Sequence, residues 1–298
     1  MGTTRSGIAV RTLVGHRQIG LGAKCLASLS LFSQEPVHVI VHEDGSVTEE
    51  DKEDFCAQVP DCSFVMKKDV DPQMNDFLDK YPACKNLRNT LVLGQKLFDI
   101  QVLGEEENLA YADSDVLFLR PFSDLFQMPS DPNAGGVFMR DRIQGYCLRS
   151  TQLLLTPGLK LADRMNSGLF YFRRAAFDWD LLEWFLSHDR FEAHPFWKEQ
   201  TAWSVLAAAT RSWMWSEKQV RVIASERDFD GDLVAAHFVS MYRSLLDKAP
   251  AHSSRTASLT KIHSVPGGEC TSFKLLLDEL MRKGQSMGLV SKEQRVFD

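Results

Sequence analysis

The sequence predicts an α/β fold in which a mixed, mostly parallel sheet is flanked by helices. Strand-like and helix-like segments alternate through the first half of the chain, which is typical of crossover connections between parallel strands. The 298 residues are enough to bury one large core. Apolar residues make up 44% of the chain and charged residues 25%, which is the balance of an ordinary globular protein.

The first half of the chain contains the clearest elements. Apolar, β-branched runs predict strands, and apolar residues at helical spacing predict helices. The expected strands cover residues 8–14, 37–42 and 63–66, and the expected helices cover 21–32 and 48–58. The second helix has a recognisable start, because Thr48 is followed three residues later by Asp51, as in a capping box. Ligands of such folds bind at the carboxyl ends of the parallel strands.

The second half has fewer clear elements. Apolar runs predict three strands: one ends at residue 112, one covers 116–119 and one follows Gly168. Helices are predicted over 204–209 and 271–285. The last helix is amphipathic, and we expect its apolar face to pack on the rest of the protein. That face carries Phe273, Leu276, Leu277, Leu280 and Met281.

Charge and hydropathy exclude several classes of protein. The chain has 34 Lys and Arg against 40 Asp and Glu, and the net charge of −6 does not favour binding to nucleic acid. No apolar run approaches the ~20 residues of a membrane-spanning helix, so no transmembrane segment is expected. The start lacks an apolar signal core and the 6 cysteines form no C-x-x-C pair, so we expect a cytoplasmic protein with reduced thiols. The absence of G-x-G-x-x-G and G-K-[ST] loops disfavours dinucleotide enzymes and P-loop NTPases.

An acidic motif follows the strand that ends at residue 112. Asp113-Ser114-Asp115 lies between two apolar runs, where a pair of carboxylates is costly unless it has a partner. Carboxylates two residues apart on a strand point to the same face, so they can converge on one cation. Oxygen ligands suit Mg²⁺ or Mn²⁺, and such an ion can bridge a diphosphate. We therefore interpret Asp113 and Asp115 as metal ligands rather than as part of a solvated loop.

Three weaker motifs follow along the chain. Asn166-Ser167-Gly168 precedes an apolar run. The asparagine amide can bind sugar hydroxyls, and the glycine lets a ligand approach the backbone closely. An ordinary turn before a strand has the same pattern. Glu199-Gln200 comes before a helical segment, where an acid commonly complements the helix dipole. His237 lies among apolar residues, where histidine is more often packed in a core than bound to a metal.

Taken in order, these motifs resemble those of the nucleotide-sugar-dependent glycosyltransferases with a GT-A fold. They are most similar to glycosyltransferase family eight, the glycogenin and bacterial galactosyltransferase group. In that family a D-x-D motif ends a strand, an N-S-G strand and a D-Q helix start follow, and a histidine with a basic residue six positions later comes near the end. The corresponding order spans roughly residues 8–245 here. The resemblance implies a Rossmann-like GT-A sheet and a sugar-transferring enzyme.

The resemblance also implies roles for individual residues. The ligands of a Mn²⁺ or Mg²⁺ ion would be Asp113, Asp115 and His237. The nucleotide sugar would be bound by His16, Arg17, Lys96, Asp113, Ser114, Asn166, Ser167, Gly168 and Arg243. The catalytic groups beside the transferred sugar would be Asn166, Glu199 and Gln200.

The reaction implied is the transfer of a hexose from a nucleoside diphosphate sugar, expected to be a UDP-sugar, to a hydroxyl of a glycan, protein or small molecule. Membership of family eight would mean that the sugar keeps its configuration, with Gln200 stabilising the ring. An inverting reaction would instead need a general base such as Asp141 or Glu199. A nucleotidyltransferase and a non-catalytic nucleotide-sugar-binding module remain as alternatives.

The resemblance divides the chain and suggests an acceptor side. Residues 1–248 would form the GT-A catalytic domain, and 249–298 a helical extension packed on the same domain. The loop over 141–160 is the expected acceptor-binding segment, because acceptor pockets are built from surface loops. The candidates for stacking on a sugar are Phe196, Trp197 and Trp203.

Overall fold

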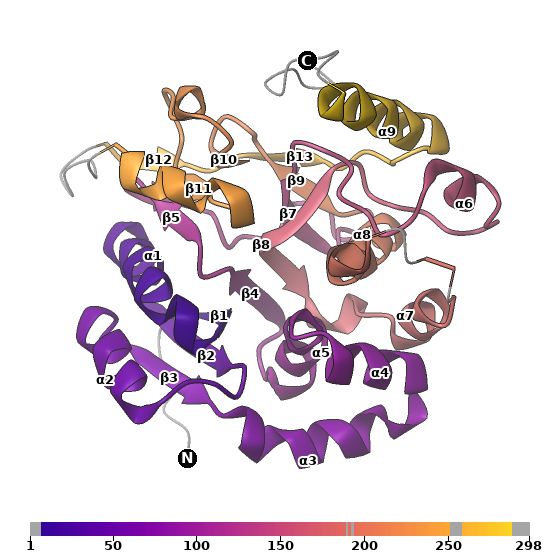
Figure 1. Ribbon diagram of the computed structural model, residues 1–298. Coiled ribbons are helices and arrows are strands. Elements are labelled where there is room, and N and C mark those ends of the chain that lie inside the picture. The colour runs from indigo at the N-terminus through magenta and orange to yellow at the C-terminus, as the bar shows by residue number, and fades with distance from the viewer. Residues whose placement is uncertain (1–6, 189, 192–193, 251–257, 288–298) are drawn as a thin grey trace.

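The computed structural model describes residues 7–188, 190–191, 194–250 and 258–287. In this part of the chain, helices lie on both faces of an eight-stranded sheet (Figure 1). The order of its strands is β13–β9–β7–β8–β4–β1–β2–β3. They are β1 (Ile8–Val14), β2 (Val37–Glu43), β3 (Cys62–Val65), β4 (Asn108–Ala112), β7 (Gly136–Arg140), β8 (Met165–Arg173), β9 (Trp213–Trp215) and β13 (Ser264–Pro266).

The sheet is mixed and mostly parallel, as predicted. Strands β3, β2, β1 and β4 run parallel to one another, and β7 runs parallel to β9. β8 is antiparallel to both β4 and β7, and β13 is antiparallel to β9. Two smaller sheets complete the strands, in the orders β10–β11–β5 and β12–β6. They consist of β10 (Val220–Val222), β11 (Ala235–His237), β5 (Val116–Phe118), β12 (Thr260–Lys261) and β6 (Phe122–Ser123).

The sheet separates two apolar cores, because alternate residues of a strand point to opposite faces. On β4, Ala110 and Ala112 pack with α1 and α2, whereas Tyr111 packs in the core formed with α4, α5, α7 and α8. Figure 1 shows these two sets of helices on either side of the sheet. The helices are α1 (Ile19–Phe32), α2 (Glu49–Gln58), α3 (Lys67–Phe77), α4 (Pro82–Thr90), α5 (Leu93–Leu103), α6 (Ser150–Leu154), α7 (Trp179–Leu186), α8 (Lys198–Ala209) and α9 (Ser272–Ser286).

The predicted capping box is confirmed at the start of α2. The Asp51 backbone N–H donates to Thr48 Oγ1 at 3.2 Å, and the Thr48 N–H donates to Asp51 Oδ2 at 2.8 Å. The two bonds satisfy donors that the first helical turn leaves unpaired. The predicted strands and helices of residues 8–66 agree with the observed ones to within two residues, whereas helices α3, α4 and α5 over residues 67–103 were not predicted.

The C-terminal helix α9 packs through a different face from the one expected. Leu275 and Asp278 are buried, whereas Phe273, Leu276 and Leu280 are exposed. Asp278 accepts a hydrogen bond from the Gln144 backbone N–H at 3.2 Å and pairs with Arg282 at 2.8 Å, which fixes the polar side of the helix inward. The division at residue 248 remains a prediction, although β13 joins the main sheet. Every described helix is too short or too polar to cross a bilayer.

Candidate active site

The carboxyl ends of three parallel strands meet at one edge of the main sheet. Because β1, β2 and β4 are parallel, the residues that follow them, Gly15, Asp44 and Asp113, lie at the same edge. A cavity of about 750 Å³ opens there, and all three residues line it. It extends past the start of β8 to helices α8 and α9. Its position agrees with the rule that ligands of α/β sheets bind at the carboxyl ends of parallel strands.

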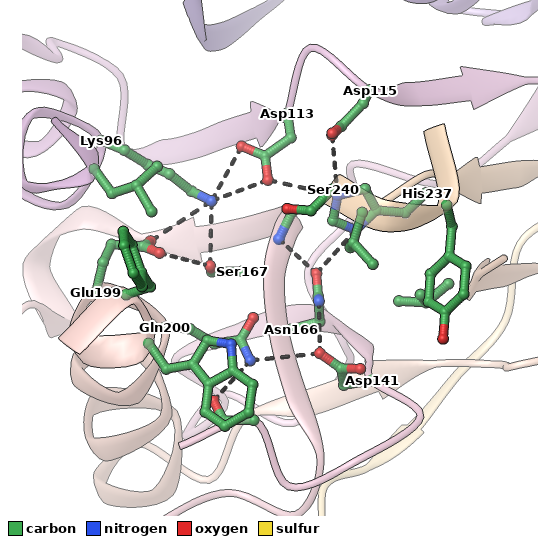
Figure 2. Close-up of a pocket in the computed structure, with 18 of the residues that line it drawn as sticks. Lys96, Asp113, Asp115, Asp141, Asn166, Ser167, Glu199, Gln200, His237 and Ser240 are labelled. Carbon is green, nitrogen blue, oxygen red and sulfur yellow. Dashed lines mark hydrogen bonds and ion pairs between the residues drawn. The ribbon is translucent and has the colours of Figure 1, made fainter. Parts of the chain in front are cut away.

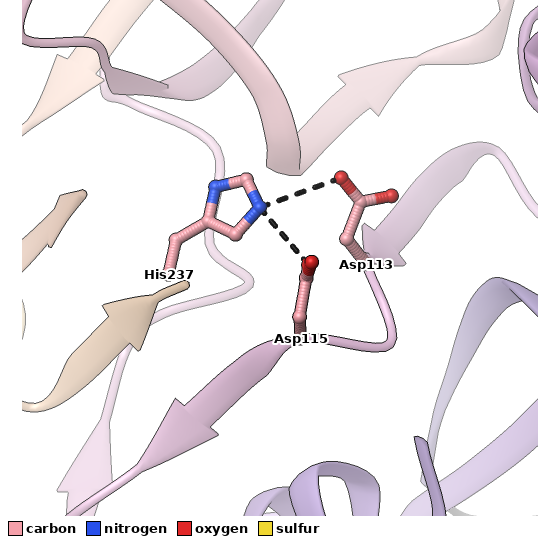
Figure 3. Close-up of side chains that lie close together, drawn as sticks. All are labelled: Asp113, Asp115 and His237. Atoms are coloured by element: carbon pink, nitrogen blue, oxygen red, sulfur yellow. Dashed lines mark hydrogen bonds and ion pairs between the residues drawn. The ribbon is translucent and has the colours of Figure 1, made fainter. Parts of the chain in front are cut away.

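Strand pairing brings the two aspartates and the distant histidine together. Asp113 and Asp115 lie in the short connection between β4 and β5. β11 is antiparallel to β5 and places His237 opposite Val116, beside Asp115. His237 Nε2 lies 3.1 Å from Asp115 Oδ1 and 3.7 Å from Asp113 Oδ2 (Figure 3). The structure therefore gathers the three metal ligands implied by the sequence resemblance.

These three side chains suit a small divalent cation. Their potential ligand atoms lie within 4.8 Å of one another. Adjacent ligands of an octahedral ion, each about 2.1 Å from the metal, are separated by about 3.0 Å. The contacts of 3.1 and 3.7 Å therefore need only a small adjustment to surround an ion. Two carboxylates and a neutral imidazole are ligands that Mn²⁺ and Mg²⁺ accept.

Asn166 fixes the orientation of the His237 ring. Its Oδ1 accepts from the Gly168 backbone N–H at 2.8 Å and its Nδ2 donates to Asp141 Oδ2 at 2.8 Å, so the amide has one consistent orientation. His237 Nδ1, 3.1 Å from the same Oδ1, must then be the donor. With Nδ1 as the donor, the neutral form of the ring would have its unprotonated Nε2 toward the two carboxylates, as in metal-binding histidines.

Neighbouring positive charges keep the buried carboxyl group of Asp115 ionised. Burial by itself would raise the pKa of Asp115, but His237 and Arg243 outweigh it and lower that pKa. Arg243 donates to Asp115 Oδ2 from Nε at 3.0 Å and from Nη2 at 2.8 Å. Burial by itself would lower the pKa of His237, but Asp115 and then Asp113 raise it. The site is thus a compact arrangement of paired charges.

Lys96 forms a second charged group next to Asp113. It comes from α5, is 2% exposed, and its Nζ lies 3.1 and 3.2 Å from the two oxygens of Asp113. Nζ also donates to Ser167 Oγ at 3.2 Å and lies 3.6 Å from Glu199 Oε1. Tyr111 donates to Asp113 Oδ1 at 2.8 Å. Asp113 is therefore held by two side chains from the protein interior.

Glu199 is a buried acid whose charge is costly. It is 2% exposed in the first turn of α8, and its Oε2 accepts from Ser167 Oγ at 3.0 Å. Burial raises its pKa to about 7, against the lowering effect of Lys96. The helix-dipole interpretation explains its position in the first turn, but the ion pair with Lys96 also connects it to the site.

Gln200 lines the cavity and contacts the loop over residues 141–160. Its Nε2 donates to the Gly145 carbonyl at 2.9 Å and lies 3.4 Å from Asp141 Oδ2. Asp141 thereby connects Gln200 with Asn166, and through Asn166 with His237 (Figure 2). Asp141 and Gly145 both belong to the loop that was expected to bind an acceptor, and both line the cavity.

Most of the site residues expected from the sequence line this one cavity. They are Lys96, Asp113, Ser114, Asp115, Asn166, Ser167, Gly168, Glu199, Gln200, His237 and Arg243. His16 and Arg17 are not on its wall; Gly15 and Gln18 are, and His16 Nδ1 instead pairs with Asp51 Oδ2 at 2.8 Å.

Of the three aromatic candidates for sugar stacking, two line the cavity. Phe196 and Trp197 lie on its wall. Trp203 does not, because it is fully buried and packs against Phe138, Phe170 and Phe172 in the apolar core.

Sequence reasoning missed several residues of the cavity wall. Asp44 follows β2, and the position after a parallel strand was a usable signal for it. Tyr111 looked like an ordinary strand residue, yet its hydroxyl bonds to Asp113. Met281 and Arg282 reach the cavity from α9, which no local pattern indicates.

The fold matches those of solved glycosyltransferases. The galactosyltransferase LgtC, solved in complex with donor and acceptor sugar analogs, superposes with a TM-score of 0.54 at 10% identity, over 78% of this chain and 87% of that one. Mouse xyloside xylosyltransferase 1 superposes with a TM-score of 0.51 at 11% identity, over 79% of this chain and 99% of that one. No protein-family model matches the sequence, and no curated protein is detectably similar to it. The chain therefore has the GT-A fold expected from its motifs.

Proposed function

We propose that this protein is a metal-dependent glycosyltransferase that moves a sugar from a nucleoside diphosphate sugar, most simply a UDP-sugar, to an acceptor hydroxyl. The observation that carries the proposal is the convergence of Asp113, Asp115 and His237 on one cavity, at the sheet edge where this fold binds ligands. Fold similarity alone would not be sufficient, because one fold can host many functions.

The proposed metal ligands are Asp113, Asp115 and His237, with Mn²⁺ or Mg²⁺ as the ion. When bound, the ion would supply positive charge to neutralise the diphosphate as it leaves. The chain's own contribution is to hold the ligands in place. Lys96 and Tyr111 restrain Asp113, and Asn166 restrains His237.

Arg243 is the best-placed cation for the donor's diphosphate. Its side chain is 39% exposed and lines the cavity, so it can exchange its pairing with Asp115 for a pairing with phosphate. Guanidinium groups bind phosphate oxygens through two parallel hydrogen bonds. Lys96, in contrast, is buried among Asp113, Ser167 and Glu199. We therefore assign Lys96 mainly to positioning Asp113, and Arg243 to the donor.

The acceptor would approach from the side of α8 and α9. Phe196 and Trp197 lie there, and the ring of Trp197 is covered by Arg282, 5.2 Å from its centroid. Gln200 and Asn166 lie between this side and the metal ligands, where the transferred sugar would bind (Figure 2). We propose retention of configuration. If the reaction inverts, Asp141 is the better general base, because Glu199 is buried against Lys96 and Ser167.

The test is a screen of nucleotide sugars for metal-dependent binding and hydrolysis. We expect a UDP-sugar with Mn²⁺ to raise the melting temperature and to be hydrolysed slowly, whereas Asp115→Asn should lose both effects. Equal stabilisation by CTP or ATP, with release of pyrophosphate, would indicate a nucleotidyltransferase. Donor binding without hydrolysis or transfer to any offered hydroxyl would indicate a binding module. No metal-dependent effect of any nucleotide sugar would contradict the proposal.

A further inference from the structure

Two cysteine sulfurs face each other on the half of the sheet that carries β3. Cys56 lies near the end of α2 and Cys62 is the first residue of β3, the last strand of the eight-stranded sheet. Their Sγ atoms are 2.9 Å apart, and both residues are free cysteines. A disulfide bond has a length of about 2.05 Å, so the sulfurs need to approach by only about 0.9 Å.

This pair differs from the other cysteines in its access to solvent. Cys56 and Cys62 are partly exposed, whereas the remaining four are at most 2% exposed. Those four are Cys25, Cys84, Cys147 and Cys270. A reagent in solution can therefore reach the two facing thiols without the core opening, which is what selective oxidation requires.

The pair does not have the partners of a metal site. In the part of the chain that the structure describes, the group of three His, Cys, Asp or Glu side chains close enough to share an ion is the one in the cavity, at Asp113, Asp115 and His237. Two thiols without further ligands fall short of the four that a structural zinc site uses. Their proximity is better explained by chemistry between the two sulfurs.

We propose that Cys56 and Cys62 form a redox-sensitive dithiol that a small-molecule disulfide converts into an intramolecular disulfide. In the first step a cysteine thiolate attacks one sulfur of the oxidant, forms a mixed disulfide and releases one thiol. In the second step the other cysteine thiolate attacks the mixed disulfide and releases the second thiol. Overall, two cysteine thiols and one disulfide become one protein disulfide and two small thiols, so the cysteines are oxidised and the reagent is reduced.

The short distance between the sulfurs favours the second step. The Sγ atoms of Cys56 and Cys62 are 2.9 Å apart. Whichever cysteine attacks the reagent first, the other therefore lies beside the mixed disulfide and can close the ring.

The disulfide would connect the end of α2 to an edge strand through a loop of five intervening residues, 57–61. Closing a short loop removes freedom from the unfolded chain, so we expect the melting temperature to rise by about 2–5 °C on oxidation. Cys56 and Cys62 do not line the cavity, so the bond constrains the fold without contacting the proposed active site.

The experiment incubates the folded protein in glutathione buffers of increasing oxidation. The protein is then unfolded in denaturant, its remaining thiols are blocked, and its tryptic peptides are analysed by mass spectrometry. Both cysteines lie in one peptide, residues 53–67, which follows Lys52 and ends at Lys67. We expect this peptide to lose two hydrogens and take up no blocking group, while the peptides of the other four cysteines stay fully blocked. In Cys62→Ser and in Cys56→Ser the remaining cysteine has no partner with which to close a ring, so we expect the peptide to carry one glutathione.

Three results would overturn the proposal. The first is a peptide 53–67 that keeps two blockable thiols at every glutathione ratio. The second is a peptide that carries a glutathione on each cysteine without closing the ring. The third is oxidation that occurs only in denaturant or that lowers the melting temperature, because either would mean that the native fold does not accommodate the bond.

Discussion

Replacing Glu199 by Gln should make the protein more stable at high pH. The folded-state pKa of Glu199 is raised from an ordinary value of 4.5 to about 7, chiefly by burial. Between these values the folded protein keeps a proton that the unfolded chain has released, so the free energy of unfolding falls as the pH rises. The difference corresponds to about 3 kcal/mol, since one pKa unit is worth about 1.4 kcal/mol.

Protonated Glu199 contributes this free energy of unfolding in full below pH 4.5, and the contribution is lost as the pH rises to about 7. Glu199→Gln keeps a carbonyl acceptor for Ser167 but has no proton to lose. Wild type and variant should therefore have similar stabilities near pH 5, and the variant should be more stable by about 3 kcal/mol at pH 8. The assay is urea unfolding followed by tryptophan fluorescence at several pH values, with the difference between the two proteins plotted against pH.

A matched variant makes the assay sharper. Ser167 donates to Glu199 at 3.0 Å, and this bond lowers the pKa of the carboxyl. Ser167→Ala should therefore raise that pKa, so the loss of stability should extend to higher pH than in the wild type. A stability difference between Glu199→Gln and the wild type that does not change from pH 5 to pH 8 would refute the reasoning.

Three further predictions concern the proposed metal site. In Gly168→Ala the new Cβ would lie 2.2 Å from His237 Cε1, so the ring must move by at least about 1.3 Å to reach normal contact. A thermal-shift titration should show loss of Mn²⁺ stabilisation. Tyr111→Phe removes the 2.8 Å hydrogen bond to Asp113 and should weaken Mn²⁺ binding about tenfold in calorimetry; unchanged affinity would contradict the positioning role. Arg243→Met frees Asp115 from its ion pair, so Mn²⁺ alone should bind at least as well while UDP in the presence of Mn²⁺ binds about tenfold more weakly; equal losses for both ligands would contradict the assignment.

The parts of the site that follow from local pattern were predictable from the sequence. Asp113 and Asp115 lie directly after a buried strand, and the parallel direction of that strand and β1 sets the edge of the sheet to which they belong. The fold class could be predicted because the strands and helices of residues 8–66 alternate with clear periodicities, whereas helices α3, α4 and α5 gave no such signal. His237 was implied only by the order of motifs, because nothing in its neighbourhood specifies that β11 pairs with β5.

The features that could not be predicted depend on contacts between distant segments. Helix α9 has a clear apolar stripe, yet the polar contacts of Asp278 with Gln144 and Arg282 face inward and leave Phe273 exposed. His16 had the residue type expected of a nucleotide contact, but the side chain pairs with Asp51 of α2. Local sequence does not encode which neighbour a polar side chain will find in the folded protein.

The spacing of the proposed ligands has a consequence for synthesis on the ribosome. His237 follows Asp115 by 122 residues, which corresponds to about 6–24 s of translation at typical rates. Lys96 and Tyr111 precede Asp113, so this carboxylate emerges after its partners. The partners of Asp115, in contrast, are His237 and Arg243, which are synthesised after it. A divalent ion that needs all three ligands could thus bind only after β11 has been synthesised, and it would stabilise the segments made before β11 rather than nucleate their folding.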